Sequence, residues 1–570
     1  MKLFIKKIYL TLFFLSIVSV NAEIFAKDSK NEYFRENFSS YFLGTVSYNN
    51  HNAEKAYEYL DKIKKIDNRH SNYKTQYIHT LVLLKKFKKA IAFSKEINKN
   101  NNSLFEADLL LGISSIIEED YDKAEKYFFG LNEVSQHHDM YKGFLKNALL
   151  SWTAAAQNNK EKSFYHFNQI NQQYYNLKRI QNSLLQCYFD TSIVEKSYQE
   201  LINDKNNVFS RYNFFLGNYL LHKNKNKKAK EIISYSSKFY GSNVLLKQVN
   251  SFIMSDKSEK IINLFNCQNP KDNIAEIFYI LSNLYASEKK YNLSNFYLNI
   301  SLLLNNKFTP NKALLAENLF FEKKYKISRK VYNSLKSIGA IYSWYASKSI
   351  STIISATENE DLSVLNLEKD FDLLVSPNFT HYYEMANFYK DKKYYEKAID
   401  FYSIALEKIT KDQTLTPKIL YRRGTSYERL NNWDKAEVDL KKSLEILPNQ
   451  PLVLNYLAYT WIEKKINIEQ ALKMLKRAVE LDEDNGYILD SLGWAHYTNK
   501  NYIIAEEFLQ QAVELMPLES VINDHYADTL WMLNKNIQAR YFWKQILDLD
   551  DIEKDLKKKV SKKLVFGLIK

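Results

Sequence analysis

The sequence predicts an all-α protein, built as a solenoid of antiparallel helix pairs that ends in a capping helix. The chain has 570 residues but only 11 glycines and 7 prolines, which favours helices over a turn-rich β fold. Apolar residues recur at helical spacing on both sides of short polar breaks. Small residues return at intervals close to 34 residues, which indicates that one helical pair is repeated along the chain.

Residues 1–22 have the pattern of a secretory signal peptide. Three lysines precede the apolar run IYLTLFFLSIVSV, and Val20 and Ala22 provide small residues for cleavage after Ala22. The run is short for a membrane span, and no cysteine lies near the cleavage point to carry a lipid. We therefore expect an exported chain, periplasmic or associated with the cell envelope. An uncleaved N-terminal anchor is the alternative.

The helix pair is clearest in residues 485–517, where two apolar faces flank the polar tetrapeptide TNKN. Gly493 and Ala505 lie on these faces, and we expect them to let the two helix axes approach closely. The second-helix alanine recurs over the C-terminal part in steps of 38, 35, 34 and 34 residues, and near the N-terminus in two steps of 34. The small residues assigned to such contacts are Gly44, Ala56, Ala90, Gly112, Ala124, Gly217, Ala229, Ala386, Ala398, Gly424, Ala436, Ala458, Ala471, Gly493, Ala505, Ala527 and Ala539.

The regularity of the repeat divides the chain. We expect a helical solenoid over residues 23–357, with degenerate repeats in 151–357, and a regular array over 378–550. Residues 358–377 have weak periodicity before a Pro-Asn pair, and we expect them to join the two blocks. Residues 551–570 carry an apolar stripe beside several lysines, which indicates a capping helix. A basic amphipathic helix that contacts a membrane is the alternative.

The repeat resembles the tetratricopeptide repeat family, in which a Leu-Gly pair, aromatics, alanines and a proline recur. One unit carries this resemblance at Leu492, Gly493, Ala505, Leu509, Ala512 and Pro517, and another at Gly424, Tyr427, Ala436 and Pro448. The resemblance implies a right-handed superhelix. It also implies that the first helices of the pairs line a concave face that binds peptides or protein partners.

Transferring the family's register to this sequence names the concave positions. They are Tyr383, Asn387, Lys418, Tyr421, Thr425, Asn455, Tyr459, Asp490, Trp494, Tyr497, Asp524, Asp528 and Trp531. For the two tryptophans, packing between repeats is an equal alternative, and for the aspartates a solvated helix face is the alternative. Some family members hold a C-terminal carboxylate with Lys, Arg and Asn. Here Asn387, Lys418 and Arg422 hold comparable positions, while Tyr383 stands where a lysine is expected.

The C-terminal block, from LNYLAYTWIEKK to VINDHYADTLW, resembles exported proteobacterial tetratricopeptide proteins. Some of these act as adaptors that deliver substrates to envelope proteases. The resemblance implies a protein-binding scaffold or adaptor of the bacterial cell envelope, with an envelope protease or its substrates as partners. We expect no nucleic acid partner, and membrane contact is not required.

Two other functions stay open. The formal charge of +14 comes from lysines dispersed over helix faces, and we attribute it to general composition; an anionic membrane or cell-wall polymer as partner is the alternative. No HExxH, GxSxG, Gly-rich phosphate loop or CxxC occurs, so we assign no catalytic residue, cofactor or metal ligand. The cluster His137-His138-Asp139 supplies no third ligand. An envelope or cell-wall enzyme with its catalytic segment in residues 152–355 is the second alternative.

Cys187 and Cys267 are the two cysteines of the chain. In an oxidising compartment they could pair, but the interpretation we favour is two separate buried thiols.

Overall fold

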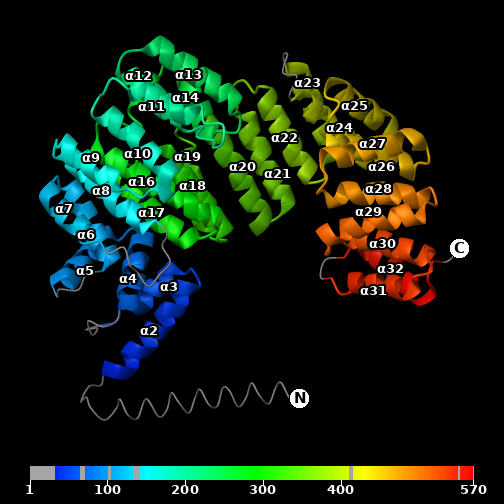
Figure 1. Cartoon of the computed structure of the whole chain (residues 1–570), viewed down its shortest axis with the longest axis horizontal. Helices are drawn as coiled ribbons and strands as arrows, with labels where there is room; N and C mark the ends of the chain where they lie inside the picture. Colours follow the sequence, from blue (N-terminus) through cyan, green and yellow to red (C-terminus); the bar gives the residue numbers. More distant parts are fainter. Residues whose placement is uncertain are drawn as a thin grey trace. The chain divides into compact units, whose positions relative to one another are not determined.

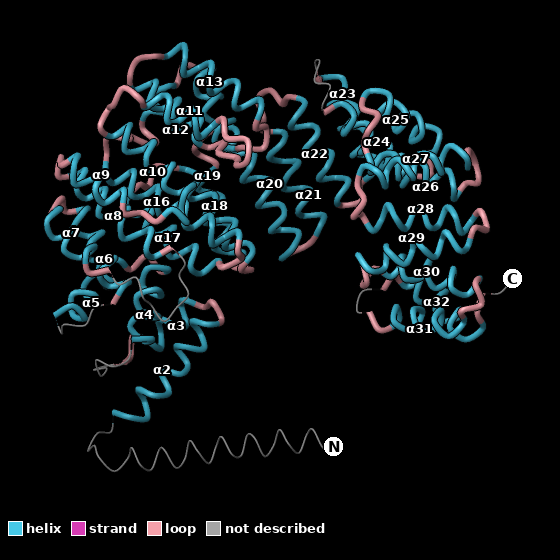
Figure 2. The backbone as a smooth tube through the Cα atoms, in the orientation of Figure 1, coloured by secondary structure: helices cyan, strands magenta, loops and turns pink. Residues whose placement is uncertain are grey.

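The structure is a computed structural model that describes residues 33–63, 71–99, 104–131, 141–409, 415–549 and 552–568. These residues form helices joined by turns, with no strand among them, as Figure 2 shows. The all-α prediction is therefore confirmed. The predicted signal peptide and the cluster His137-His138-Asp139 lie outside the described residues. The chain divides into two compact units, Met1–Leu367 (unit 1) and Glu368–Lys570 (unit 2).

Unit 1 contains successive helix pairs from α2 to α20, and α21 crosses its boundary (Figure 1). The helices are α2 (Tyr33–Asn49), α3 (Ala53–Leu60), α4 (Ser71–Leu83), α5 (Phe87–Lys99), α6 (Phe105–Ile117), α7 (Tyr121–Phe129), α8 (Lys142–Ala156), α9 (Lys160–Asn168), η1 (Gln172–Tyr174), α10 (Tyr175–Tyr188), α11 (Val194–Ile202), α12 (Tyr212–His222), α13 (Asn226–Phe239), α14 (Val244–Met254), α15 (Ser258–Ile262), α16 (Pro270–Ser287), α17 (Tyr291–Leu304), α18 (Thr309–Phe321), α19 (Tyr325–Leu335), α20 (Ala340–Thr357) and α21 (Glu360–Asp372).

Unit 2 continues the same order of short helices. They are α22 (Phe379–Asp391), α23 (Tyr395–Lys408), α24 (Thr416–Arg429), α25 (Trp433–Ile446), α26 (Pro451–Glu463), α27 (Ile468–Leu481), α28 (Gly486–Thr498), α29 (Tyr502–Leu515), α30 (Ser520–Met532), α31 (Asn536–Leu547) and α32 (Lys554–Phe566). None of the helices in the described part of the chain has both the length and the apolar character needed to cross a membrane.

The two helices of a pair are joined by a tight turn with one residue in the left-handed region. In the predicted TNKN break this residue is Lys500, with φ of 63°. The equivalent turn residues are His51, Lys85, Glu119, Asn158, Asp190, Asn224, Asp256, Lys289, Lys323, Lys393, Asn431, Lys465 and Asn534. The same turn conformation thus recurs in both units, including pairs whose sequences have lost the repeat pattern.

The predicted small residues lie where paired helices approach closely. Ala398, Ala436 and Ala505 are fully buried. A Cβ added to Gly493 would lie 2.6 Å from Leu509 Cγ, so the absent side chain of the glycine makes room for the leucine. Leu509 lies one turn beyond Ala505, the residue that the spacing predicts as the neighbour. The glycine is therefore required by packing, although its nearest neighbour is one turn further along.

In the degenerate region, 151–357, the helix pairs are still formed, and serine replaces alanine at the second-helix contact position of two of them. Ser294 takes the place of the second-helix alanine, and its hydroxyl donates to the carbonyl of Ser282 at 2.7 Å. The Ser328 hydroxyl donates in the same way to the Ala316 carbonyl at 2.7 Å. A serine is as small as the contact requires, and the bond satisfies its buried hydroxyl. The helix pairs therefore continue where the alanine signal fades.

Unit 1 folds back on itself, so that later helices cover the first helices of earlier pairs. α17 packs on α4, α16 on α8 and α20 on α14 (Figure 1). His79 on α4 stacks on Phe296 of α17 with ring centroids 4.2 Å apart. Gln248 on α14 accepts hydrogen bonds from the backbone N–H groups of Ile341 and Tyr342 in α20. In unit 1 the chain itself therefore covers much of the face that the first helices present.

The expectation of two separate thiols is wrong, because Cys187 and Cys267 form a disulfide. Cys187 lies near the end of α10, and Cys267 lies between α15 and α16. Their Cα atoms are 5.9 Å apart although 80 residues separate them in sequence. The fold-back of unit 1 brings these segments together, and the spacing of two cysteines carries no information about such a return of the chain.

The C-terminal helix α32 caps unit 2, as the apolar stripe predicts. Val560 is fully buried against α31, and Ile552, Leu556 and Leu564 pack around the same cluster. Lysines of α32 face outward, among them Lys558 and Lys562. This helix covers the apolar side of the last pair and presents charges to solvent.

Candidate protein-binding face of the C-terminal helix pairs

The predicted binding residues lie on the first helices of successive pairs in unit 2. α22 carries Tyr383 and Asn387, α24 carries Lys418, Tyr421 and Thr425, α26 carries Asn455 and Tyr459, α28 carries Asp490, Trp494 and Tyr497, and α30 carries Asp524, Asp528 and Trp531. Lys418 is exposed, and most of the aromatic and amide side chains are half-buried. Thr425 and the three aspartates are buried.

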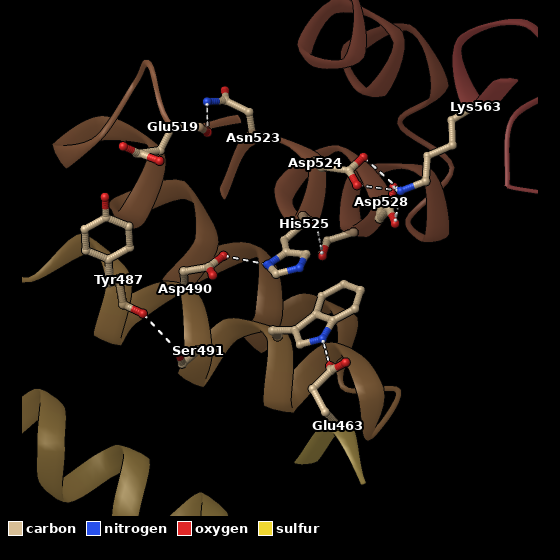
Figure 3. Close-up of polar contacts among 12 residues, drawn as sticks. Glu463, Tyr487, Asp490, Ser491, Glu519, Asn523, Asp524, His525, Asp528 and Lys563 are labelled. Atoms are coloured by element: carbon tan, nitrogen blue, oxygen red, sulfur yellow. Dashed lines mark hydrogen bonds and ion pairs between the residues drawn. The ribbon is translucent and has the colours of Figure 1, made fainter. Parts of the chain in front are cut away.

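The α30 end of this face is occupied by the chain's own C-terminal helix. The Lys563 ammonium group of α32 lies between the carboxylates of Asp524 and Asp528, with N–O distances of 2.7–2.8 Å (Figure 3). Trp543 Nε1 also donates to Asp528 Oδ1 at 3.2 Å. Asp524 and Asp528 are 7% and 5% exposed, so this pair is engaged inside the protein.

Burial shifts the protonation of Asp528. Burial, with repulsion from Asp524, raises the pKa of Asp528 to about 6, although Lys563 opposes the shift. The neighbouring Asp490 accepts a hydrogen bond at 2.9 Å from His525 Nδ1, which carries the proton in this pair (Figure 3). Burial disfavours the charged imidazole, but Asp490 holds the pKa of His525 above its usual value. The aspartates of α28 and α30 therefore pair with basic groups of the same unit.

The middle of the face is aromatic. The Trp494 ring stacks between His525, at 3.9 Å, and Tyr497, at 4.5 Å between ring centroids. The indole N–H donates to Glu463 at 2.7 Å, which fixes the plane of the ring. Trp494 thus packs between repeats, as one of the two interpretations predicts, and it is half-buried, while its role as a binding residue stays a prediction.

On α26, next to this aromatic group, one polar atom lacks a partner. Asn455 Oδ1 is buried and accepts no hydrogen bond from the described residues. Tyr459, one turn further along α26, is half-buried, and burial raises the pKa of its hydroxyl. A neutral phenol and an unused amide acceptor can both hydrogen-bond to a peptide backbone.

The α22–α24 end is basic. Tyr402 donates to Asn387 Oδ1 at 2.7 Å, and Arg422 lies beside the Tyr402 hydroxyl. Burial disfavours the charge on Arg422, but Tyr383 and Tyr402 hold its pKa above the usual value. Burial, with repulsion from Arg422, lowers the pKa of Lys390. Cations held close together in this way favour a ligand with negative charge.

Lys390 was not predicted from the sequence, and Arg422 was considered only as part of a carboxylate-binding group, not among the concave positions. Lys390 follows Ala386 by four residues, as Tyr497 follows Gly493 and Trp531 follows Ala527. The repeat register could therefore have found Lys390, since the same position had already been chosen on α28 and α30. No group of three or more His, Cys, Asp or Glu side chains in the described ranges could hold a metal ion.

The fold and this face define the class of the protein. Stacked helix pairs with an aromatic and charged face on their first helices form an α-helical scaffold. The family model of the tetratricopeptide repeat matches residues 417–450, which cover α24 and α25. Residues 417–450 of the chain therefore match one tetratricopeptide repeat, within an all-α fold of stacked helix pairs. Proteins of this family are generally protein-binding scaffolds.

Similar proteins share only part of the chain. A TPR repeat-containing protein of Pseudomonas aeruginosa, PA4667, is 31% identical over 99 residues, which is 17% of this chain and 17% of that protein. Human Protein O-mannosyl-transferase TMTC1 is 24% identical over 115 residues, 20% of this chain and 13% of that protein. The chain thus spans less than a fifth of the length of these relatives. The Thermus thermophilus TPR protein TTC0263 is 18% identical, with a TM-score of 0.29, and covers 33% of this chain and 100% of its own.

Proposed function

We propose that this chain is an exported scaffold or adaptor of the bacterial cell envelope that captures partner segments on the first-helix face of α22–α28. The observation that carries the proposal is the set of side chains that the first helices α22, α24, α26 and α28 leave accessible. They present half-exposed aromatic rings, close cations and the unpartnered Asn455 oxygen. In α30 the corresponding aspartates are already engaged by Lys563.

The charges on this face define the chemistry of the partner. Arg422 and Lys390 favour a carboxylate at the α22–α24 end, whereas Trp494 and Tyr459 favour apolar or aromatic side chains at the α26–α28 end. A partner segment with acidic and aromatic residues, from an envelope protein such as a protease or its substrate, fits both ends. Because these helices already form a packed face, little of the binding energy is lost in ordering the scaffold.

Export is part of the proposal and has two supports. The first is the signal-peptide pattern of residues 1–22. The second is the disulfide between Cys187 and Cys267, because disulfides persist in oxidising compartments such as the periplasm. Periplasmic fractionation of cells that express the tagged chain tests this step. A reduced chain retained in the cytosol would contradict it.

Capture of a partner tests the binding face. Tagged protein is purified from the native envelope, its partners are identified, and binding of the purified partner is then measured. We expect Tyr459→Ala together with Trp494→Ala to weaken binding at least about tenfold, a loss of about 1.4 kcal/mol. The matched control is Tyr541→Ala, which removes an aromatic ring of α31 that is 65% exposed.

The outcome depends on both variants retaining the helical circular dichroism of the parent. Binding that survives in the Tyr459/Trp494 variant would show that partners use another surface. Equal loss in the Tyr541 control would also count against the proposed face. Replacing Arg422 by Gln distinguishes the two ends, since it should weaken binding of acidic partner segments and reduce the salt dependence.

A further inference from the structure

The first helix of unit 1, α2, exposes an apolar surface. Phe38, Phe42, Leu43 and Val46 are 61%, 59%, 43% and 39% exposed. Their spacing places them on adjoining sides of one helix. Together they form an apolar patch on the order of a few hundred Å², the size at which such patches mark interaction sites. These four residues make up the α2 face.

The repeat register shows what the α2 face corresponds to in later pairs. Gly44 of α2 packs on Leu60, as Gly493 of α28 packs on Leu509. In this register Leu43 corresponds to Leu492 and Val46 to Ala495. Both residues of α28 are fully buried in a cluster with Leu457 and Trp461 of the preceding helix pair. Phe42 likewise corresponds to the buried Ser491, whereas Phe38 corresponds to Tyr487, which is 50% exposed. The part of the α2 face around Phe42, Leu43 and Val46 is therefore a stacking face on which another helix belongs.

Other pairs of unit 1 bury this position too. Around Gly112 of α6, Leu110 and Leu111 are 1% and 2% exposed, and around Gly217 of α12, Phe215 and Leu216 are equally buried. The side of α2 that faces the next pair is in use, because Thr45 donates to Gln76 and Tyr48 hydrogen-bonds His79. The exposed residues thus lie away from the contacts that α2 makes with α4.

Charge decides which occupant fits. Residues 38–50 contain no charged side chain, in a chain of which 26% is charged. Two copies of the α2 face can therefore pair without burying a charge. A head-to-tail contact would instead place this face on α32, which exposes Val565 and Phe566 but surrounds them with Lys557, Lys558, Lys559 and Lys562. Contact between two α2 faces is isologous and closes after two chains.

We propose that two copies of this chain associate through the α2 face to form a two-fold dimer. Each α2 supplies to its partner the helix that a preceding repeat supplies elsewhere in the chain. The two phenylalanines fill the space between the helices, and the interface holds apolar side chains at its centre. This inference does not depend on the proposed partner-binding face of unit 2.

Sedimentation velocity of the mature chain, beginning at Glu23, tests the dimer. From submicromolar to tens of micromolar concentration, we expect a species of twice the chain mass. Phe42→Glu together with Val46→Glu should raise the dissociation constant more than about 100-fold, because two carboxylates would be buried without partners. The control is Tyr235→Glu together with Phe239→Glu, which charges two exposed apolar residues on one side of α13 in the same way.

A single cysteine tests the geometry. The two native cysteines form a disulfide, so Val46→Cys introduces a thiol without a native competitor. A short bifunctional maleimide should link two chains through residue 46 in a two-fold dimer. A dimer that resists this linkage would overturn the proposed geometry.

Three further results would overturn the proposal. The first is a monomeric parent chain over the whole concentration range. The second is a dimer that persists in the Phe42/Val46 variant while circular dichroism shows an unchanged fold. The third is a monomeric parent that dimerises only when residues 23–32 are deleted, because the chain's own N-terminal segment would then cover the α2 face.

Discussion

In several pairs of unit 1 the residue that follows the contact position of a first helix is enclosed, whereas in unit 2 the equivalent residue often remains half-exposed. Ile113, Trp152 and Asn218 of unit 1 are at most 2% exposed. Tyr459 and Trp494 of unit 2 are half-buried. One and the same helix pair thus builds a closed core in one part of the chain and leaves a face for other molecules in another.

The difference comes from contacts between distant pairs. In unit 1 a continuous apolar cluster extends in sequence from Ala56 to Phe308. In unit 2 the core consists of smaller clusters, each made by neighbouring pairs, such as the one around Trp461 and the one around Trp543. A stack held by nearest neighbours can open locally, while long-range contacts make unfolding cooperative. The two units should therefore respond differently to the same kind of perturbation.

The largest effect is expected from removing the disulfide of unit 1. Replacing Cys187 and Cys267 together by serine opens a crosslink between residues 80 positions apart. In the loop-entropy description this lowers the free energy of unfolding of unit 1 by about 4 kcal/mol. Urea titration followed by hydrogen exchange and mass spectrometry should show earlier unfolding of the helices of unit 1, with those of unit 2 unchanged.

Unit 2 is the internal control for this measurement. Unit 2 holds no cysteine, so its unfolding midpoint should be unchanged in the double variant. Reducing agent added to the parent chain should reproduce the effect. Equal destabilisation of both units would mean that they do not unfold independently.

A smaller effect, confined to unit 2, is expected from Lys563→Met. The substitution leaves Asp524 and Asp528 buried without their cation. Removing one partner of a buried ion pair lowers the free energy of unfolding by about 3 kcal/mol. Thermal unfolding at pH 8 should show the loss in the α30–α32 region. The neighbouring Lys562→Met removes an exposed lysine of the same helix and should change stability by less than about 0.5 kcal/mol.

The pH dependence of this site has a definite sign. Asp528 titrates in the folded chain with a pKa of about 6, above its usual value of 3.8. The folded state therefore binds this proton more tightly, and this carboxyl group's contribution to stability falls as the pH rises from about 4 to about 6. The cost of Lys563→Met should be smaller at pH 5 than at pH 8. A cost that does not change with pH would exclude Asp528 as its source.

The sequence predicts the helix pairs well because their determinants are local. A glycine such as Gly493 and a polar break such as TNKN are read within one repeat, and the structure confirms the paired helices there. The capping helix is equally local, since the stripe of Val560 and Leu564 is visible in one segment. The register also places the candidate residues on the first helices of the pairs in unit 2, where the structure has them.

The features that sequence reasoning missed are long-range. The disulfide depends on the return of α16 toward α8 and α10, and no residue near Cys187 or Cys267 announces that return. The capture of Asp524 by Lys563 joins positions 39 residues apart, on helices that were assigned separate roles. Such contacts follow from how the pairs curve and meet, which the period of the repeat does not specify.

The smallest effect should be the same in both units, because it depends only on the turn that they share. Lys289 in unit 1 and Lys500 in unit 2 are exposed turn residues with φ of 60° and 63°. A side chain disfavours this left-handed conformation, whereas glycine adopts it freely. After the greater entropy of glycine in the unfolded chain is subtracted, Lys289→Gly and Lys500→Gly should each stabilise their unit by about 0.5 kcal/mol. Alanine at either position keeps the strain and is the matched control. Calorimetry that shows a gain in one unit and a loss in the other would mean that the turns are not equivalent, and that the two units differ in their pairs as well as in how those pairs pack.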